Sequence, residues 1–265
     1  MATAFGRYLS LSPRPFHRID LSQPRLQLLH ECPFVFTVPG FLSQAECAAL
    51  RAKAASSLAP QTFDNVAGGV RSSQGAVARN EEVPELRARL AKLANVTESQ
   101  LQPLKISRYS AGDRFDIHTD AWRGDLFGAP PDPDDLWADH ARGEYGVRGA
   151  PISGVNRMAT IFVYLNTCGR GGRTRWRWTD YDATCPSGAR LGRAFYDAPG
   201  PGHGRTDVVH GAGVEVSIPP VEGTAVVHFP SVVASAGGFT DFNAYHESEA
   251  AVDEKVELST LSPRD

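Results

Sequence analysis

Short apolar segments rich in β-branched and aromatic residues recur from Leu104 onward, and they constrain the fold more than any other feature of the sequence. They are "LKISRYS" (104–110), "MATIFVYLN" (158–166), "GTAVVHFP" (223–230) and "KVELST" (255–260). This composition is typical of β-strands. Gly-, Pro- and Asp-rich connections separate these segments over 121–155 and 179–215. Connections of that length are usually functional lids or partly disordered.

Two helices are expected ahead of these strands. In "LSQAECAALRAKAASSL" (42–58), Ser43 and Glu46 have the spacing of a capping box. In "NEEVPELRARLAKLANV" (80–96), the apolar residues on one helical face are Val83, Leu86, Leu90 and Leu93. The apolar run "PFVFTVPGFL" (33–42) suits a strand.

This layout predicts an α+β fold whose core is an antiparallel barrel or jelly roll backed by N-terminal helices. Residues 1–32 are Pro-rich and aperiodic, which predicts a partly disordered or surface-draped arm. Residues 33–265 are then expected to form one domain.

Composition and charge narrow the function classes. Of 265 residues, 42% are hydrophobic and 22% charged, as in ordinary globular proteins, and the net charge of -3 argues against a nucleic-acid partner. No apolar run reaches the roughly 18 residues of a membrane helix. The N-terminus lacks the apolar segment of a secretory signal, so the expectation is a cytoplasmic protein. A trimmed chain would look the same, which leaves secretory and organellar compartments open. The oligomeric state stays open as well.

The four cysteines contain no CxxC pair, so a zinc site is not expected. Cys168 and Cys185 could pair in a secreted protein, but free buried thiols are the expectation.

"RYSAGDRFDIHTD" (108–120) contains a His-x-Asp pair, His118 and Asp120. Residues i and i+2 of a strand point to the same face, so both side chains can aim at one point inside a barrel. Such a pair arises often by chance, and two ligands do not complete an iron site of two His and one carboxylate. Tyr109, an odd number of residues before His118, requires a break near Gly112 or an approach from a neighbouring strand.

The third ligand is expected late in the chain. His203 and His210 lie in a Gly-rich loop, which is poor support for a rigid ligand. His228 lies in an apolar strand and could face inward, but no basic residue follows it at a useful distance. His246 is followed nine residues later by Lys255 on a predicted strand. A buried cation needs an anion, which a dicarboxylate cosubstrate supplies, so His246 is the predicted ligand.

These segments together resemble the prolyl 4-hydroxylase-like branch of the Fe(II)- and 2-oxoglutarate-dependent dioxygenases. Four blocks, in order between about residues 33 and 260, carry the resemblance: "VPGFLSQAECAALRAKA", "RYSAGDRFDIHTD", "RMATIFVYLNTCGRGGRTRW", and "PPVEGTAVVHFP" followed by "YHESEAAVDEK". The resemblance implies a double-stranded β-helix, a cupin-like jelly roll supported by the N-terminal helices.

The resemblance also implies the site. Fe(II) would be held by His118, Asp120 and His246, with 2-oxoglutarate and O2 as cosubstrates and ascorbate as a reductant. The far carboxylate of 2-oxoglutarate would pair with Lys255 and the Tyr109 hydroxyl. Three further residues complete the implied set: Thr174 and Ser259 in the cosubstrate pocket, and Arg157 on the substrate side.

The implied activity is hydroxylation of an aliphatic C–H bond, on a prolyl residue of a peptide or protein, with release of succinate and CO2. A free amino acid or other small molecule is the alternative substrate, and a catalytically silent 2-oxoglutarate-binding barrel is the alternative from another class. Two departures bear on the substrate: Trp176 stands where the family usually has Phe, and the 121–155 connection is long and acidic. A halogenase is disfavoured because Asp120 is present, and a nucleic-acid demethylase by the charge and by Lys255 in place of Arg.

Overall fold

Antiparallel strands make up most of the regular secondary structure of the computed structural model, which describes residues 19–31, 34–61, 71–118, 120, 157–176, 216–232, 239–240, 244 and 246–263. The strands are β1 (Gln27–Glu31), β2 (Phe34–Val38), β3 (Ala59–Pro60), β4 (Gln74–Ala78), β5 (Leu104–Tyr109), β6 (Phe115–His118), β7 (Arg157–Tyr164), β8 (Thr174–Trp176), β9 (Val216–Ile218), β10 (Ala225–His228), β11 (Ser231–Val232), β12 (Phe239–Thr240), β13 (His246–Ser248) and β14 (Lys255–Pro263). The four strand segments that the sequence predicted from Leu104 onward are confirmed as β5, β7, β10 and β14.

The strands form one large and one small sheet, with β11 and β12 as a separate pair. The large sheet has the order β1-β2-β10-β7-β14-β5-β4-β3, and the small sheet has the order β6-β13-β8-β9. Each strand of the small sheet is adjacent in sequence to a strand of the large one: β6 follows β5, β8 follows β7, β9 precedes β10 and β13 precedes β14. The chain therefore crosses between the sheets repeatedly.

Alternation along the strands sorts side chains between two faces of the large sheet. On β14, Val256 and Leu258 join the core beneath the helices. On β7 and β10, Phe162, Tyr164 and Val226 pack against residues of the small sheet in a second core. The space between the two sheets is therefore lined by side chains from both, and it is this space that holds the candidate site.

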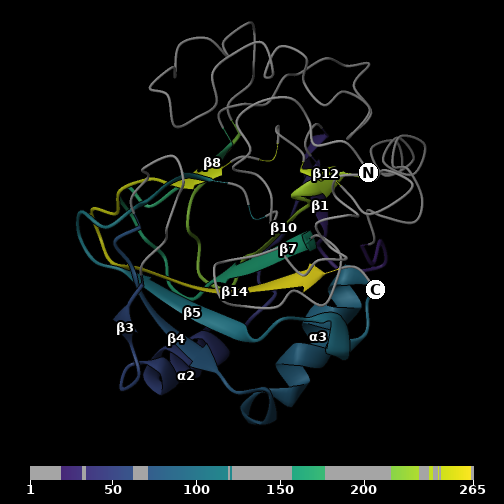
Figure 1. Ribbon diagram of the computed structural model, residues 1–265, viewed down its shortest axis with the longest axis horizontal. Coiled ribbons are helices and arrows are strands. Elements are labelled where there is room, and N and C mark those ends of the chain that lie inside the picture. The colour runs from purple at the N-terminus through teal and green to yellow at the C-terminus, as the bar shows by residue number, and fades with distance from the viewer. Residues whose placement is uncertain are drawn as a thin grey trace, which may run out of the picture.

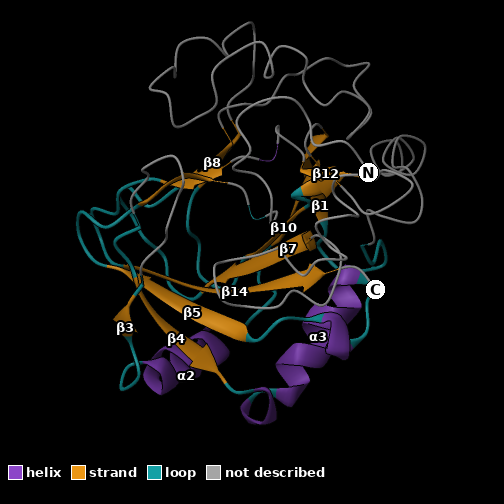
Figure 2. Cartoon of the chain, in the orientation of Figure 1, coloured by secondary structure: helices purple, strands orange, loops and turns teal. Residues whose placement is uncertain are grey.

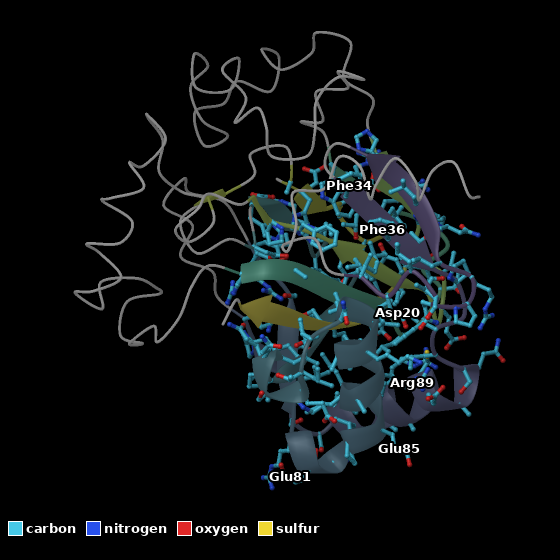
Figure 3. The ribbon with its side chains drawn as sticks, turned by 90° about the vertical axis from the view of Figure 1, so that its right-hand side faces the viewer. Asp20, Phe34, Phe36, Glu81, Glu85 and Arg89 are labelled. Carbon is cyan, nitrogen blue, oxygen red and sulfur yellow. The ribbon has the colours of Figure 1, made fainter. Side chains whose placement is uncertain are left out.

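Two α-helices, α2 (Gln44–Ala54) and α3 (Pro84–Ala94), cover the outer face of the large sheet, on the side away from β8 (Figures 1 and 2). The capping box predicted for α2 is confirmed, since Ser43 accepts from the Glu46 amide while the Glu46 carboxylate accepts from the Ser43 amide. Figure 3 labels Arg89 of α3, which pairs with Glu46 and donates to the Phe41 carbonyl. These contacts tie the two helices together.

The helix predicted over 80–96 is shorter than expected. Asn80–Glu82 form a 3₁₀ turn, and α3 begins only at Pro84. A proline disfavours helical backbone in the residue before it, and Val83 is accordingly non-helical. The predicted face is otherwise confirmed, because Leu86, Leu90 and Leu93 are buried. A second 3₁₀ turn, Glu98–Gln100, follows the helix.

Part of the region expected as an N-terminal arm belongs to the sheet. Gln27–Glu31 form β1, which pairs with β2, and Ile19 and Leu26 are buried in the core. Within the described ranges, no helix is long and apolar enough to cross a membrane. The predicted loops over 121–155 and 179–215 lie outside the described residues, as does Cys185, while Cys168 is a free, buried thiol.

Candidate metal centre

Strand pairing in the small sheet brings the two predicted histidine ligands together. His118 ends β6, and His246 begins β13 directly opposite it in the antiparallel register. Asp120 lies two residues beyond His118, past the end of the strand. One ligand atom from each of these three residues lies within 4.8 Å of the other two, so they can hold a metal ion. The three residues that the sequence predicted as ligands are thus placed side by side.

Both imidazole rings are oriented by their own backbone. His118 Nδ1 lies 2.8 Å from the Asp116 carbonyl, and His246 Nδ1 lies 3.1 Å from the Ala244 carbonyl. A carbonyl only accepts, so Nδ1 carries the proton and the lone pair is on Nε2. Each Nε2 lies 3.7 Å from an Asp120 carboxylate oxygen. The free lone pairs therefore point toward the carboxylate, as metal ligands require.

Electrostatics keep the cluster in its ligating protonation state. Burial, reinforced by the His246 charge, lowers the pKa of His118 well below its usual range. Burial likewise lowers the pKa of His246 to about 4. Burial opposes ionisation of Asp120, but the neighbouring imidazoles of His246, His228 and His118 hold its pKa well below the usual range. Neutral imidazoles beside an ionised carboxylate are the forms that bind a cation.

Two groups of the large sheet face the Oδ2 atom of Asp120. The Thr160 hydroxyl on β7 donates to it at 2.8 Å, and His228 Nε2 on β10 lies 3.3 Å away. Strand register explains the pairing, because His228 and Thr160 are directly opposite each other. The Asp120 carbonyl accepts from Arg157 at 3.1 Å. The carboxylate is therefore held by the large sheet, with Oδ1 facing His118.

His228 is the neighbour of the cluster that the sequence argument set aside. It is fully buried, and neither ring nitrogen has a hydrogen-bond partner among the described residues. Its ring lies 4.6 Å from that of His246 and 5.3 Å from that of Trp176, both measured between centroids. The alternation of side chains along β10 could have identified His228 as a site residue, because His228 shares the face of Val226, which packs on the small sheet.

The donor set fits Fe(II). Two imidazoles and one carboxylate on one side of an ion, with positions left open, are the ligands of non-haem iron oxygenases. Aromatic packing restricts water around these ligands, since Trp176 is fully buried and stacks on His246 with centroids 5.4 Å apart. Phe115 stacks on His118 from the other strand end.

Lys255 marks the second part of the site, and it is fully buried. It is directly opposite Tyr109 in the β14–β5 pairing, and Gly112, with φ of 88°, turns the chain between β5 and β6. Tyr109 therefore reaches the site from a neighbouring strand, as one of the two predicted routes required. Gly172 approaches the Lys255 side chain so closely that an added Cβ would lie 3.3 Å from its Cδ. Its φ of 66° also favours glycine.

A dicarboxylate fits this second part less simply than iron fits the first. The Lys255 ammonium already makes an ion pair with Glu257 at 2.9 Å and donates to Ser248 at 2.8 Å. The Tyr109 hydroxyl donates to the other Glu257 oxygen at 3.3 Å. Lys255 is a buried cation on the strand where the sequence predicted one, but two of its three N–H donors are in use. Glu257 was not predicted as a site residue.

The remaining predicted residues have mixed placements. The Thr174 hydroxyl accepts from Tyr164 at 2.8 Å, deep between the sheets. Ser259 is partly buried on β14, on the face of Lys255. The Arg157 guanidinium donates hydrogen bonds to the Asp120 carbonyl and to the Gln102 side chain. The cosubstrate roles of Thr174 and Ser259 and the substrate-side role of Arg157 stay predictions.

Comparison with solved structures gives a likeness of fold. A viral collagen prolyl hydroxylase from Paramecium Bursaria Chlorella virus-1, in complex with 2OG, matches with a TM-score of 0.51 at 14% identity, over 87% of this chain and 96% of its own. A prolyl-4-hydroxylase from Pseudomonas putida matches with a TM-score of 0.47 at 16% identity, over 87% of this chain and 92% of its own. No protein-family model and no curated protein matches the sequence. The resemblance to prolyl hydroxylases is thus confirmed at the level of the fold.

Proposed function

We propose that this chain is an Fe(II)- and 2-oxoglutarate-dependent dioxygenase that hydroxylates an aliphatic C–H bond, on a prolyl residue of a peptide or protein. The observation that carries the proposal is the buried cluster of His118, Asp120 and His246, whose ligand atoms lie within 4.8 Å of one another. The buried cation Lys255 on the large sheet adds the anchor that a dicarboxylate cosubstrate needs.

The fold is consistent with this proposal. Strands adjacent in sequence alternate between two packed antiparallel sheets, as a double-stranded β-helix requires, and we assign that architecture to the chain. The likeness to the viral collagen prolyl hydroxylase supports the assignment. The four sequence blocks that resemble prolyl 4-hydroxylases support the prolyl substrate.

The residues of the site have separate roles in the proposed reaction. His118, Asp120 and His246 would hold Fe(II), which supplies the O2 activation that attack on an unactivated C–H bond requires. Thr160 holds one oxygen of Asp120 at 2.8 Å and so orients the other toward the metal position. Trp176 restricts water beside His246.

Succinate release tests the reaction and its substrate. The iron-loaded protein is incubated with 2-oxoglutarate and with either proline-rich peptides or free amino acids, and products are analysed by mass spectrometry for one added oxygen. Stimulation by peptides, absent in Asp120→Ala, is the expected result. Stimulation by small molecules alone would refute the peptide substrate, and no turnover with either class would refute the hydroxylase.

A catalytically silent metal-binding barrel is the second candidate, and one observation favours it. The Lys255–Glu257 ion pair uses the cation that a cosubstrate would need. Under this alternative the protein binds Fe(II) and never forms succinate.

A further inference from the structure

The ammonium of Lys255 is surrounded by groups of the protein itself. It lies 2.9 Å from Glu257 Oε2 and 2.8 Å from Ser248 Oγ. The ring centroids of Tyr109 and Tyr164 lie 4.8 and 5.6 Å away, within the range of cation–π contacts. An ammonium has three N–H donors, and two of them are already used. A ligand carboxylate would have to share or replace these partners.

The Glu257 carboxylate takes the two donors, Lys255 and Tyr109, that the resemblance assigns to the cosubstrate. Oε2 pairs with Lys255, and Oε1 accepts from the Tyr109 hydroxyl at 3.3 Å. The pairing of Glu257 with Lys255 follows from strand geometry, because Glu257 is two positions after Lys255 on β14 and its side chain points to the same face.

Glu257 also lies within the interior of the site. Its side chain is 14% exposed, and the charge of its carboxylate contributes to the pKa values of Tyr109, Tyr164 and His246. Its carboxylate therefore acts on Lys255 from inside the site, and its charge also reaches His246 of the metal cluster.

We propose that Glu257 is an internal competitor for the far carboxylate of the cosubstrate. A dicarboxylate gains the full charge of Lys255 only when the Glu257 carboxylate leaves it, because two carboxylates a few ångströms apart repel each other and compete for one cation. A 2-oxo acid with an uncharged end meets no such competition. The site thus discriminates against 2-oxoglutarate relative to 2-oxo monocarboxylic acids. This inference rests on the proposed function.

Two ligands and two variants test the competition. 2-Oxoglutarate is compared with 2-oxopentanoate, which has a methyl group in place of the far carboxylate. Binding is measured by calorimetry on full-length, Mn(II)-loaded protein without O2, so that no turnover is needed. Glu257→Gln removes the charge and keeps the shape. Glu254→Gln is the matched control, because Glu254 is an exposed neighbour that pairs with Arg108.

Wild type is expected to bind 2-oxoglutarate no more tightly than 2-oxopentanoate. In Glu257→Gln, affinity for 2-oxoglutarate should rise on the order of tenfold or more, since Lys255 is released for the ligand. Affinity for 2-oxopentanoate should not change, and Glu254→Gln should behave as wild type. Equal 2-oxoglutarate affinity in wild type and Glu257→Gln would overturn the proposal.

The wild-type comparison does not depend on the variant folding. A wild-type preference for 2-oxoglutarate of tenfold or more would by itself overturn the competition, whatever the variants do. Binding of neither 2-oxo acid by any Mn(II)-loaded protein is a different result. It would refute the proposed function, and the inference with it.

Discussion

The two parts of the site handle their charged groups in opposite ways. At the metal cluster, His118 and His246 use Nδ1 for backbone carbonyls and leave Nε2 unprotonated, facing Asp120. At the other part, Lys255 has its charge matched within the chain, by Glu257 at 2.9 Å. The metal cluster presents ligand atoms for a cation, whereas the cation of the second part, Lys255, is already paired.

This difference separates what the two parts need from outside the chain. A metal ion would bind the unprotonated Nε2 atoms of His118 and His246 beside an ionised carboxylate, so metal binding should be strong. An anion at Lys255 must replace an existing partner, so anion binding should be weaker than the burial of Lys255 alone suggests.

Loss of one ligand should have the largest effect. His118→Ala removes one of three donors, and affinity for Fe(II) or Co(II) is expected to fall more than about 100-fold, beyond the range typical of residues that only support a ligand. Anaerobic metal titration measures this change. His30→Gln, at the edge of the large sheet, is the control. Unchanged metal affinity in His118→Ala would remove the cluster as the metal site.

Acid should destabilise the metal-free protein through the same cluster. Burial lowers the pKa of His246 to about 4, while the unfolded chain has the ordinary value of 6.5. Between these values the unfolded state binds the extra proton, so the free energy of unfolding decreases as pH falls from about 6.5 to about 4. The loss attributable to His246 is about 3 kcal/mol. Asp120, whose pKa is lowered, acts only below about 3.8 and does not contribute in this window.

Urea unfolding at a series of pH values measures this dependence. His246→Gln should make the profile shallower, since glutamine does not titrate while His118 still does. Saturating metal should raise the free energy of unfolding but leave the slope in place, because the unfolded chain still takes up the proton. An equally steep profile in His246→Gln would contradict the assignment.

Breaking the ion pair at the other part should have a smaller effect. Lys255→Met leaves the Glu257 carboxylate without its cation, and a loss of about 2 kcal/mol in the free energy of unfolding is expected, reduced from the fully buried case because Glu257 is partly exposed. The double variant Lys255→Met/Glu257→Gln should recover most of the lost stability. If the double variant is as unstable as Lys255→Met, the loss of stability does not come from an unneutralised Glu257 carboxylate.

The site residues that could be predicted from the sequence are those that belong to a local strand pattern or to a motif. His118, Asp120, His246 and Lys255 were identified from spacing and from resemblance, and the structure brings the first three together. The argument that a buried cation needs an anion was sound, but the anion it meets in the structure is Glu257. Alternation on β14 held that signal, because Glu257 is two residues beyond Lys255.

Contacts that depend on strand register could not be predicted. Thr160 and His228 meet at Asp120 because β7 and β10 pair with these two residues opposite each other, and no local pattern specifies which residues face each other across strands distant in sequence. The start of α3 was misplaced for a local reason, the backbone restriction that Pro84 imposes on Val83.

Thr160 should give the smallest effect, and it tests whether the large sheet orients the metal ligand. Thr160→Val keeps the shape but removes the hydroxyl that donates to Asp120 Oδ2 at 2.8 Å. Metal affinity is expected to fall about tenfold, as for other groups that hold a ligand. Thr160→Ser should restore it. Thr260→Val is the matched control, because Thr260 is equally buried but donates to the Gln102 carbonyl. If Thr160→Val lowers stability yet leaves metal affinity as in Thr260→Val, Thr160 packs the sheet without orienting Asp120.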